Sequence, residues 1–157
     1  MSFRRGFSLI ELVIVLVILG IIAGFATQRL RGVTARKSLA DATDRIRAFD
    51  TALRREALVN RKPVAARIDR GSSMLIVRSS PTQEFRLPGR VTIQSIVMGR
   101  EFAGPQDSLM ARSDGASQSY AIELRCDEST RWVMVAGGSG QMKVFADRQA
   151  VAMLLGG

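Results

Sequence analysis

A single acidic residue, Glu11, interrupts an otherwise apolar run from Phe7 to Ala26. Ser8 is the only other polar side chain in this run, and two arginines and Gly6 directly precede it. An unpaired carboxylate in a membrane helix costs on the order of 3 kcal/mol on insertion scales. A positively charged partner lowers that cost considerably. The chemistry that Glu11 offers is therefore ion pairing within an apolar environment.

Catalytic and metal-binding side chains are scarce elsewhere. The sequence contains no histidine, which excludes Ser-His-Asp and Cys-His catalysis and zinc sites built from Cys and His. Cys126 is the only cysteine, so an internal disulfide is excluded as well. Asp127 and Glu128 could in principle bind calcium, but adjacent acids before Ser129 and Thr130 are more typical of a hairpin tip. We expect no enzyme activity, no cofactor and no metal.

The apolar run has the length of a membrane-spanning helix. Twenty residues at about 1.5 Å per residue cover roughly 30 Å, the hydrocarbon thickness of a bilayer. Gly20 and Gly24 stand four residues apart, a spacing that lets a second helix approach closely. Glycines are also common in membrane helices that lack such a partner. A helix-packing role for Gly20 and Gly24 is therefore one of two open interpretations.

Two ordinary interpretations of the N-terminus leave Glu11 without a role. A cleaved secretory signal has a basic start, an apolar middle and a small-x-small site. Gly24-Phe25-Ala26 provides such a site, and cleavage there would start the mature chain at Thr27. A simple single-pass anchor is the second interpretation. Neither gains anything from a carboxylate inside the apolar run.

A third interpretation gives Glu11 a purpose. The string Arg4-Arg5-Gly6, followed by Phe7-Ser8-Leu9-Ile10-Glu11 and an apolar helix, resembles the N-terminus of type IV prepilins and type II secretion pseudopilins. The resemblance implies cleavage between Gly6 and Phe7 by a prepilin peptidase, followed by N-methylation of Phe7. It also implies that the carboxylate of Glu11 pairs with a Phe7 amine, in the same or a neighbouring subunit, during filament assembly.

The same resemblance implies a single-pass protein of the inner membrane, with a cytoplasmic N-terminus and a periplasmic head. Arg4 and Arg5 favour that orientation by the positive-inside rule. Four basic residues on the other flank make the charge balance ambiguous; they are Arg29, Arg31, Arg36 and Lys37. The prepilin-like motif decides our expectation in favour of a cytoplasmic N-terminus.

The helix is expected to continue well beyond the apolar run, because no proline occurs between Phe7 and Lys62. Apolar residues recur at steps of three and four, which marks one helical face. Two helices broken near Gly32 are the alternative. The residues of the expected face are Leu39, Ala42, Ile46, Phe49, Leu53 and Ala57.

Short strand candidates separated by Gly, Pro, Ser and Asp clusters follow the helix. We expect an α+β, pilin-like fold in which antiparallel sheet packs on the second half of the long helix. Residues 98–119 are expected to form a long loop, and residues 147–154 a short closing helix. The expected strands are residues 64–68, 74–77, 91–97, 120–124, 132–135 and 142–145. The expected organisation is a leader at 1–6, a transmembrane half-helix at 7–26, an amphipathic half-helix at 27–62 and a globular head at 63–157.

Two further stretches resemble the GspH/FimT family of minor pseudopilins and minor pilins. They are "RREALVNRKPVAARID" and "SYAIELRCDESTRWVMVAGGSGQMKV". The resemblance implies a structural subunit of the type II secretion pseudopilus, which aids protein export across the outer membrane. Its implied partners are the prepilin peptidase, the inner-membrane assembly platform, the major pseudopilin, other minor pseudopilins and membrane lipid.

Two other functions remain open. One is a minor type IV pilin of the FimT kind that binds DNA during natural transformation, which the net charge of +9 favours. DNA binding in such proteins uses a basic exposed tail, whereas the C-terminus "RQAVAMLLGG" has one arginine. Nucleic acid is therefore not the partner we expect. The other is a secreted β-domain with an ordinary signal peptide.

Overall fold

One long helix dominates the N-terminal third of the chain. The computed structural model describes residues 9–99 and 107–155, and for residues 25–31 only the backbone. Helix α1 (Leu9–Asn60) is continuous through Gly32, so the alternative of two helices is wrong. The chain divides into two compact units with the boundary between Thr34 and Ala35, and α1 contributes to both.

The end of α1 has a clear local cause. Arg61 adopts a left-handed backbone with φ of 50°, and its N–H donates to the carbonyl of Leu58 at 3.4 Å. A left-handed residue directly after the last turn is a common way for a helix to stop. Pro63 follows, and it could not continue the helix because it lacks a backbone N–H.

Within the head, α1 buries one stripe of apolar side chains. Each is 4% exposed or less, and successive members are three or four residues apart, as the sequence pattern predicts. The stripe forms one wall of the main hydrophobic core. Its members are Ala35, Leu39, Ala42, Ile46, Phe49, Leu53 and Ala57.

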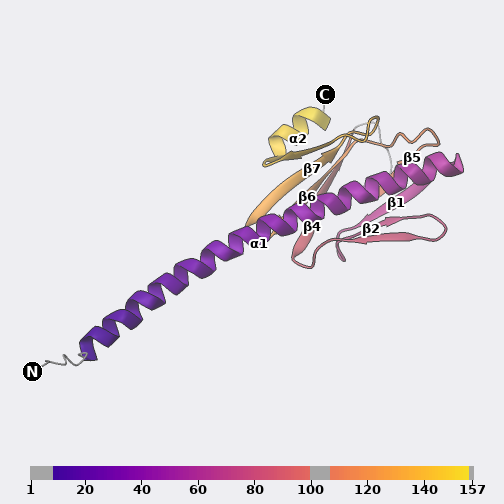
Figure 1. The fold of residues 1–157 in the computed structure, drawn as a ribbon. Coiled ribbons are helices and arrows are strands. Elements are labelled where there is room, and N and C mark those ends of the chain that lie inside the picture. The colour runs from indigo at the N-terminus through magenta and orange to yellow at the C-terminus, as the bar shows by residue number, and fades with distance from the viewer. Residues whose placement is uncertain (1–8, 100–106, 156–157) are drawn as a thin grey trace, which may run out of the picture. The chain divides into compact units, whose positions relative to one another are not determined.

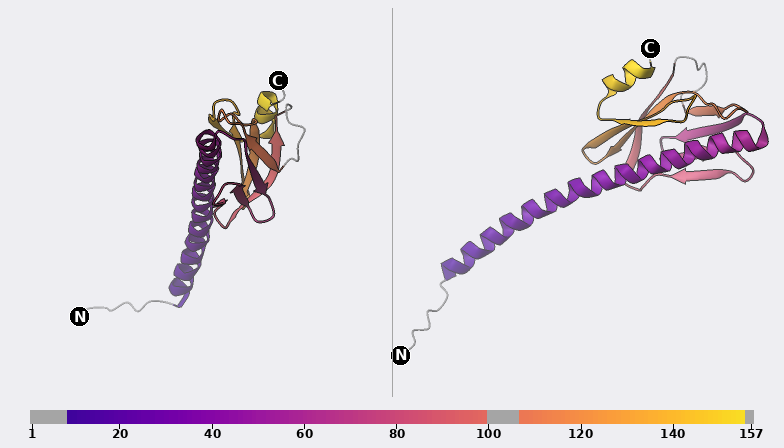
Figure 2. Two further views of the ribbon diagram at one scale, coloured as in Figure 1. Left: turned by 90° about the vertical axis from the view of Figure 1, so that its right-hand side faces the viewer. Right: turned by 45° about the horizontal axis from the view of Figure 1, so that its top comes forward.

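Two four-stranded antiparallel sheets occur in the described part of the head, together with the short helix that closes it (Figures 1 and 2). The first sheet has the strand order β3-β2-β1-β5, and the second has the order β4-β6-β7-β8. The first comprises β1 (Val64–Asp69), β2 (Met74–Val77), β3 (Gln83–Arg86) and β5 (Ser108–Ala111). The second comprises β4 (Val91–Met98), β6 (Tyr120–Cys126), β7 (Ser129–Val135) and β8 (Met142–Phe145).

Two of these strands, β3 and β5, correct the sequence prediction. The expected loop at residues 98–119 contains β5, and β3 was absent from the expected strands. The segment "QEFR" has one apolar residue, and "SLMA" has no β-branched or aromatic one, so neither shows a strand signal of its own. Their pairing partners hold them in place, with Phe85 opposite Leu75 and Leu109 opposite Ala66.

The second sheet is covered on both faces. One face packs on α1 through the main core, which includes Ile122 and Val133. The other face packs against the closing helix α2 (Arg148–Leu155) in a smaller cluster that includes Trp132 and Val151. Figures 1 and 2 show α2 lying against the sheet on the side opposite to α1. The expected closing helix is thus confirmed, displaced by one residue.

Candidate functional site

The residues of the N-terminal motif are only partly described. Gly6 and Phe7, the expected cleavage and methylation positions, lie outside the described residues. Glu11 lies in the first turn of α1 with an exposed side chain. A carboxylate is favourable there because the helix N-terminus carries a partial positive charge. The pairing of Glu11 with a Phe7 amine stays a prediction.

Gly20 and Gly24 present an open surface on α1. A Cβ atom added at either position would meet no heavy atom within 4 Å. Residues four apart share one face of a helix, so these two glycines leave a shallow strip of backbone accessible. Close approach by a second helix at this strip stays a prediction.

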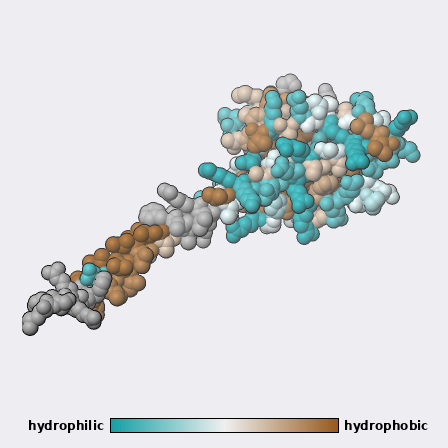
Figure 3. Space-filling model, in the orientation of Figure 1, coloured by the Kyte–Doolittle hydropathy of each residue, from teal (hydrophilic) through white to brown (hydrophobic). Residues whose placement is uncertain are grey.

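The first part of α1 exposes its apolar side chains on every side. From Leu9 to Ile22 each large hydrophobic residue is between 46% and 84% exposed. Figure 3 shows this stretch as a mainly brown, hydrophobic surface. A helix that is apolar all round is normally covered by lipid or by other protein. The surface of α1 from Leu9 to Ile22 is therefore suited to an apolar environment.

Over the part of the chain that the structure describes, no helix combines the length and the apolar character needed to cross a membrane. The span expected at 7–26 begins in residues outside that part.

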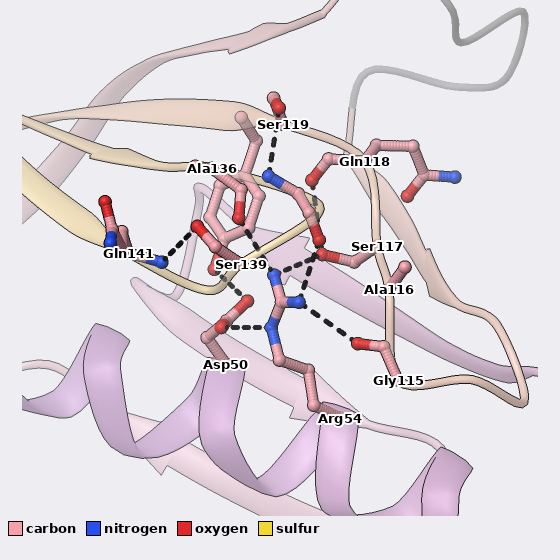
Figure 4. Close-up of polar contacts among 12 residues, drawn as sticks. Asp50, Arg54, Gly115, Ala116, Ser117, Gln118, Ser119, Ala136, Ser139 and Gln141 are labelled. Atoms are coloured by element: carbon pink, nitrogen blue, oxygen red, sulfur yellow. Dashed lines mark hydrogen bonds and ion pairs between the residues drawn. The ribbon is translucent and has the colours of Figure 1, made fainter.

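The head contains a buried polar group that we call the Arg54 cluster, comprising Asp50, Arg54, Ser117, Tyr120 and three loop carbonyls. Figure 4 shows Arg54 reaching from α1 toward Gly115, Ser117 and Ala136. Arg54 Nε donates to Asp50 Oδ2 at 2.6 Å, one helical turn away on α1. Its Nη2 donates to Ser117 Oγ at 2.8 Å. The remaining bonds go to the carbonyl oxygens of Gly115 at 3.0 Å, Gly137 at 2.8 Å and Ala136 at 3.3 Å.

Tyr120 completes the cluster from the opposite side. Its hydroxyl donates to Asp50 Oδ1 at 3.2 Å, so both carboxylate oxygens of Asp50 are bonded. Burial raises the pKa of Tyr120 well above 10.0, and the charge of Asp50 and the hydrogen bond to it raise that pKa further. A phenol held in this way stays a hydrogen-bond donor at physiological pH. Among the described residues no buried side-chain nitrogen or oxygen lacks a partner, so the polar atoms of the cluster satisfy one another and tie α1 to the loops before β6 and after β7.

The turn after β7 is shaped by this cluster. The sequence "GGSG" at 137–140 was expected to be a turn, and the structure confirms it between β7 and β8. A Cβ at Gly137 would lie 2.1 Å from the carbonyl oxygen of Ser117, so only glycine fits there. Gly140 adopts a φ of 70° and lies against Arg54. The glycines thus let two loops close around one guanidinium.

The remaining candidate residues from the sequence lie in a turn or in the hydrophobic core of the head. Asp127 has a φ of 52° in the turn between β6 and β7, which confirms the expected hairpin tip. No cluster of three or more potential metal ligands occurs within the described ranges 9–99 and 107–155. Cys126 is buried, and that burial, together with the charge of Asp127, raises the pKa of its thiol. Trp132 is 3% exposed beneath α2.

Comparison with known proteins gives two kinds of likeness. No match was found among curated proteins. Two solved structures of the minor pseudopilin EpsH from the type 2 secretion system of Vibrio cholerae are similar to this chain. The first is 15% identical with a TM-score of 0.48 and covers 68% of this chain and 97% of that chain. The second is 16% identical with a TM-score of 0.47 and covers 68% and 92%. Residues 1–27 match the family described as the prokaryotic N-terminal methylation motif, which confirms the prepilin-type N-terminus expected from the sequence.

Proposed function

We propose that this chain is a structural minor pseudopilin of a type II secretion system. The observation that carries the proposal is the methylation motif at residues 1–27. Within this motif, the part of α1 from Leu9 to Ile22 exposes large apolar side chains all round. Such a surface needs lipid before assembly and other subunits after it. The head carries no constellation of catalytic side chains in the residues that the structure describes, and its buried polar groups serve packing.

In the proposed pathway the leader is removed between Gly6 and Phe7 by a prepilin peptidase, and the new amine of Phe7 is methylated. The apolar part of α1 holds the protein in the inner membrane, with the head in the periplasm. The assembly platform then transfers it into a pseudopilus of major and other minor pseudopilins. Glu11 pairs with a Phe7 amine there and sets the register of the stacked helices, because both charges are less costly together in an apolar environment. The finished pseudopilus helps move proteins across the outer membrane.

The first test is the chemistry of the N-terminus. Mass spectrometry of the mature protein from cells with an intact secretion system should find a chain that begins at a methylated Phe7. A mature start at Thr27 would instead establish an ordinary secretory signal and overturn the proposal.

The second test is assembly. Glu11→Ala should still insert, because loss of a charge makes the helix more apolar, yet its crosslinking to the major pseudopilin and the amount of secreted protein should both fall. Glu11→Asp should be intermediate because it keeps the charge with a shorter reach. Glu128→Ala, which removes an exposed acid of the head, is the matched control and should behave like the parent. Full crosslinking and secretion by Glu11→Ala would show that the charge pair is not needed.

The net charge of +9 favours a second candidate, a minor pilin that binds DNA during natural transformation. Phosphate contacts weaken steeply with salt, so the affinity must be measured at physiological ionic strength. We expect the full chain in detergent to bind duplex DNA only weakly under these conditions. Sub-micromolar binding that is lost when exposed head arginines are neutralised would favour this second function.

A further inference from the structure

Four basic residues follow the apolar run of α1 and have no task in the pathway proposed above. No aspartate or glutamate occurs between Glu11 and Asp41. In the proposed orientation the four residues lie on the periplasmic flank, where the positive-inside rule disfavours them. Removal of the leader also takes Arg4 and Arg5 away from the cytoplasmic flank, so the imbalance grows after processing. Charges that oppose the orientation of the chain point to a binding task of their own. The four residues are Arg29, Arg31, Arg36 and Lys37.

Arg36 and Lys37 have no ionic partner in the described part of the chain. Both are exposed, and neither forms an ion pair with a described residue. The next acid, Asp41, is exposed and pairs with neither of them, and Asp44 pairs with Arg47 at 3.1 Å. The stretch from 27 to 40 therefore carries four positive charges and no negative one.

These residues follow closely on the point of α1 where a bilayer would end. The hydrocarbon layer is about 30 Å thick, and each headgroup layer adds roughly 5–8 Å. In a span that ends at Ala26, Arg29 and Arg31 follow within about 8 Å along the helix, at the level of the headgroups. Arg36 and Lys37 follow at roughly 15–16 Å, and side chains of a helix lean toward its N-terminus, which is the membrane side. Since the Debye length is about 8–10 Å, all four charges act on the headgroup layer.

The charges surround α1 instead of marking one side of it. Each residue of an α-helix turns by about 100°, and α1 is continuous through this stretch. The positions of Arg29 and Arg36 therefore share one side of the helix, whereas Arg31 and Lys37 lie on two others. A protein partner recognises a helix mainly by one face, but lipid headgroups surround a helix on every side. The distribution of charge thus favours a lipid surface over a protein partner.

We infer that Arg29, Arg31, Arg36 and Lys37, which we call the basic collar, bind anionic phospholipid headgroups at the periplasmic surface of the inner membrane. The inference rests on the proposed function, because it requires the apolar run to lie in the bilayer. Basic segments beside a membrane span are attracted by lipids with a net negative charge. The collar therefore selects phosphatidylglycerol over phosphatidylcholine, whose choline group cancels the charge of the phosphate.

Resonance energy transfer from the basic collar to labelled lipids tests this inference. Val33→Cys puts a thiol between the basic residues at a side chain that is 65% exposed. The parent, whose Cys126 is buried, is the blank for labelling. The full chain with a donor dye at position 33 is reconstituted in vesicles of equal parts phosphatidylglycerol and phosphatidylcholine. The acceptor is a trace of either lipid, labelled on an acyl chain so that the headgroup is unchanged.

We expect phosphatidylglycerol to be enriched about five-fold near position 33, which is the effect of roughly one basic residue at an anionic surface. The enrichment should fall when the salt concentration is raised from 0.1 M to 1 M, because the Debye length shortens from about 10 Å to about 3 Å.

Matched variants separate the basic collar from the other basic residues. Replacement of all four collar residues by glutamine should abolish the enrichment, whereas replacement of the three arginines by lysine should retain it, because the charges are kept. Replacement by glutamine of three arginines and one lysine elsewhere in the head should leave the enrichment nearly unchanged, because these residues lie more than a Debye length beyond the collar along the chain. The four control residues are exposed, and they are Arg45, Arg55, Lys62 and Arg78.

Extraction of the same vesicles with alkaline carbonate separates failure of the inference from failure of the proposed function. The parent and the glutamine variant of the collar should both stay in the membrane, since the apolar run is unchanged. Equal transfer to both lipids from a retained parent, or full enrichment around the glutamine variant, would overturn the inference alone. Release of the parent by carbonate would overturn the inference together with the membrane anchoring on which it rests. Equal transfer to both lipids, combined with a crosslink in cells from position 33 to another pseudopilin that the glutamine variant loses, would assign the charges to a protein partner instead.

Discussion

Removal of the Arg54 side chain should be among the most damaging single changes to the head. The side chains of Arg54 and Asp50 are 14% and 6% exposed, and the shortest bond of the pair is 2.6 Å. Truncation at position 54 leaves the Asp50 carboxylate buried, with Tyr120 as its one remaining partner. Loss of one member of a buried ion pair typically costs about 3–5 kcal/mol.

We therefore expect Arg54→Ala to lower the free energy of unfolding by about 3–5 kcal/mol and the midpoint of thermal unfolding by roughly 10–15 °C. Arg54→Lys should lose less, since it keeps the charge beside Asp50 but cannot reach all the carbonyls of the two loops. The assay is thermal and urea unfolding of the full chain in detergent, followed by the fluorescence of Trp132, the single tryptophan.

Arg55→Ala is the matched control, because it removes a neighbouring arginine that is exposed, and it should change stability by less than about 0.5 kcal/mol. A double-mutant cycle with Asp50→Asn should give a coupling energy of about 1–3 kcal/mol, because the two side chains are in direct contact. If Arg54→Ala unfolds within about 1 kcal/mol of the parent, the cluster does not anchor the loops and our account of the head is wrong.

Three further outcomes follow from the same region. Gly137→Ala should destabilise the head by about 1–3 kcal/mol in the same unfolding assay, because the added Cβ would meet the Ser117 carbonyl. Gly138→Ala is its control and should be nearly neutral, because a Cβ there meets no heavy atom within 4 Å. Tyr120 is the single tyrosine, and its raised pKa means that the folded state holds the phenol proton more tightly than the unfolded state. The resulting stabilisation is complete below pH 10 and is lost as the pH rises through the folded-state pKa of Tyr120. Ultraviolet titration should therefore show phenolate only together with alkaline unfolding. A reversible titration near pH 10 in folded protein would contradict this. Cys126 should react with a thiol reagent only after denaturation, because it is buried and its pKa is raised; rapid reaction of native protein would contradict its placement.

The long helix and the hydrophobic face of its second half were predictable because their signal is local. Steps of three and four between Leu39 and Ala57 define one face of a helix whatever the rest of the chain does. The strand order was not predictable in this way. Strand β5 contains only Leu109 and Ala111 as buried apolar residues, and it forms because β1 pairs with it from more than 40 residues away.

The Arg54 cluster was missed for a related reason. Asp50 and Arg54 are four residues apart, so the sequence suggests an ordinary surface ion pair on a helix. Their burial depends on Gly115, Ser117 and Gly137, whose positions follow from the packing of both sheets on α1. The glycines after β7 were assigned to a turn correctly, but the guanidinium that the turn surrounds could not be inferred from them.

The bond from Arg54 to the carbonyl of Gly137 joins residues 83 positions apart, which has a consequence for the time course of synthesis. A ribosome adds about 5–20 residues per second, so Gly137 is made roughly 4–17 s after Arg54. Until β6, β7 and the turn that follows them have been made, the arginine and the apolar stripe beside it lack the partners that these segments supply. The nascent chain therefore keeps part of the apolar stripe of α1 uncovered until its last quarter is made, and during that time the stripe is open to wrong association.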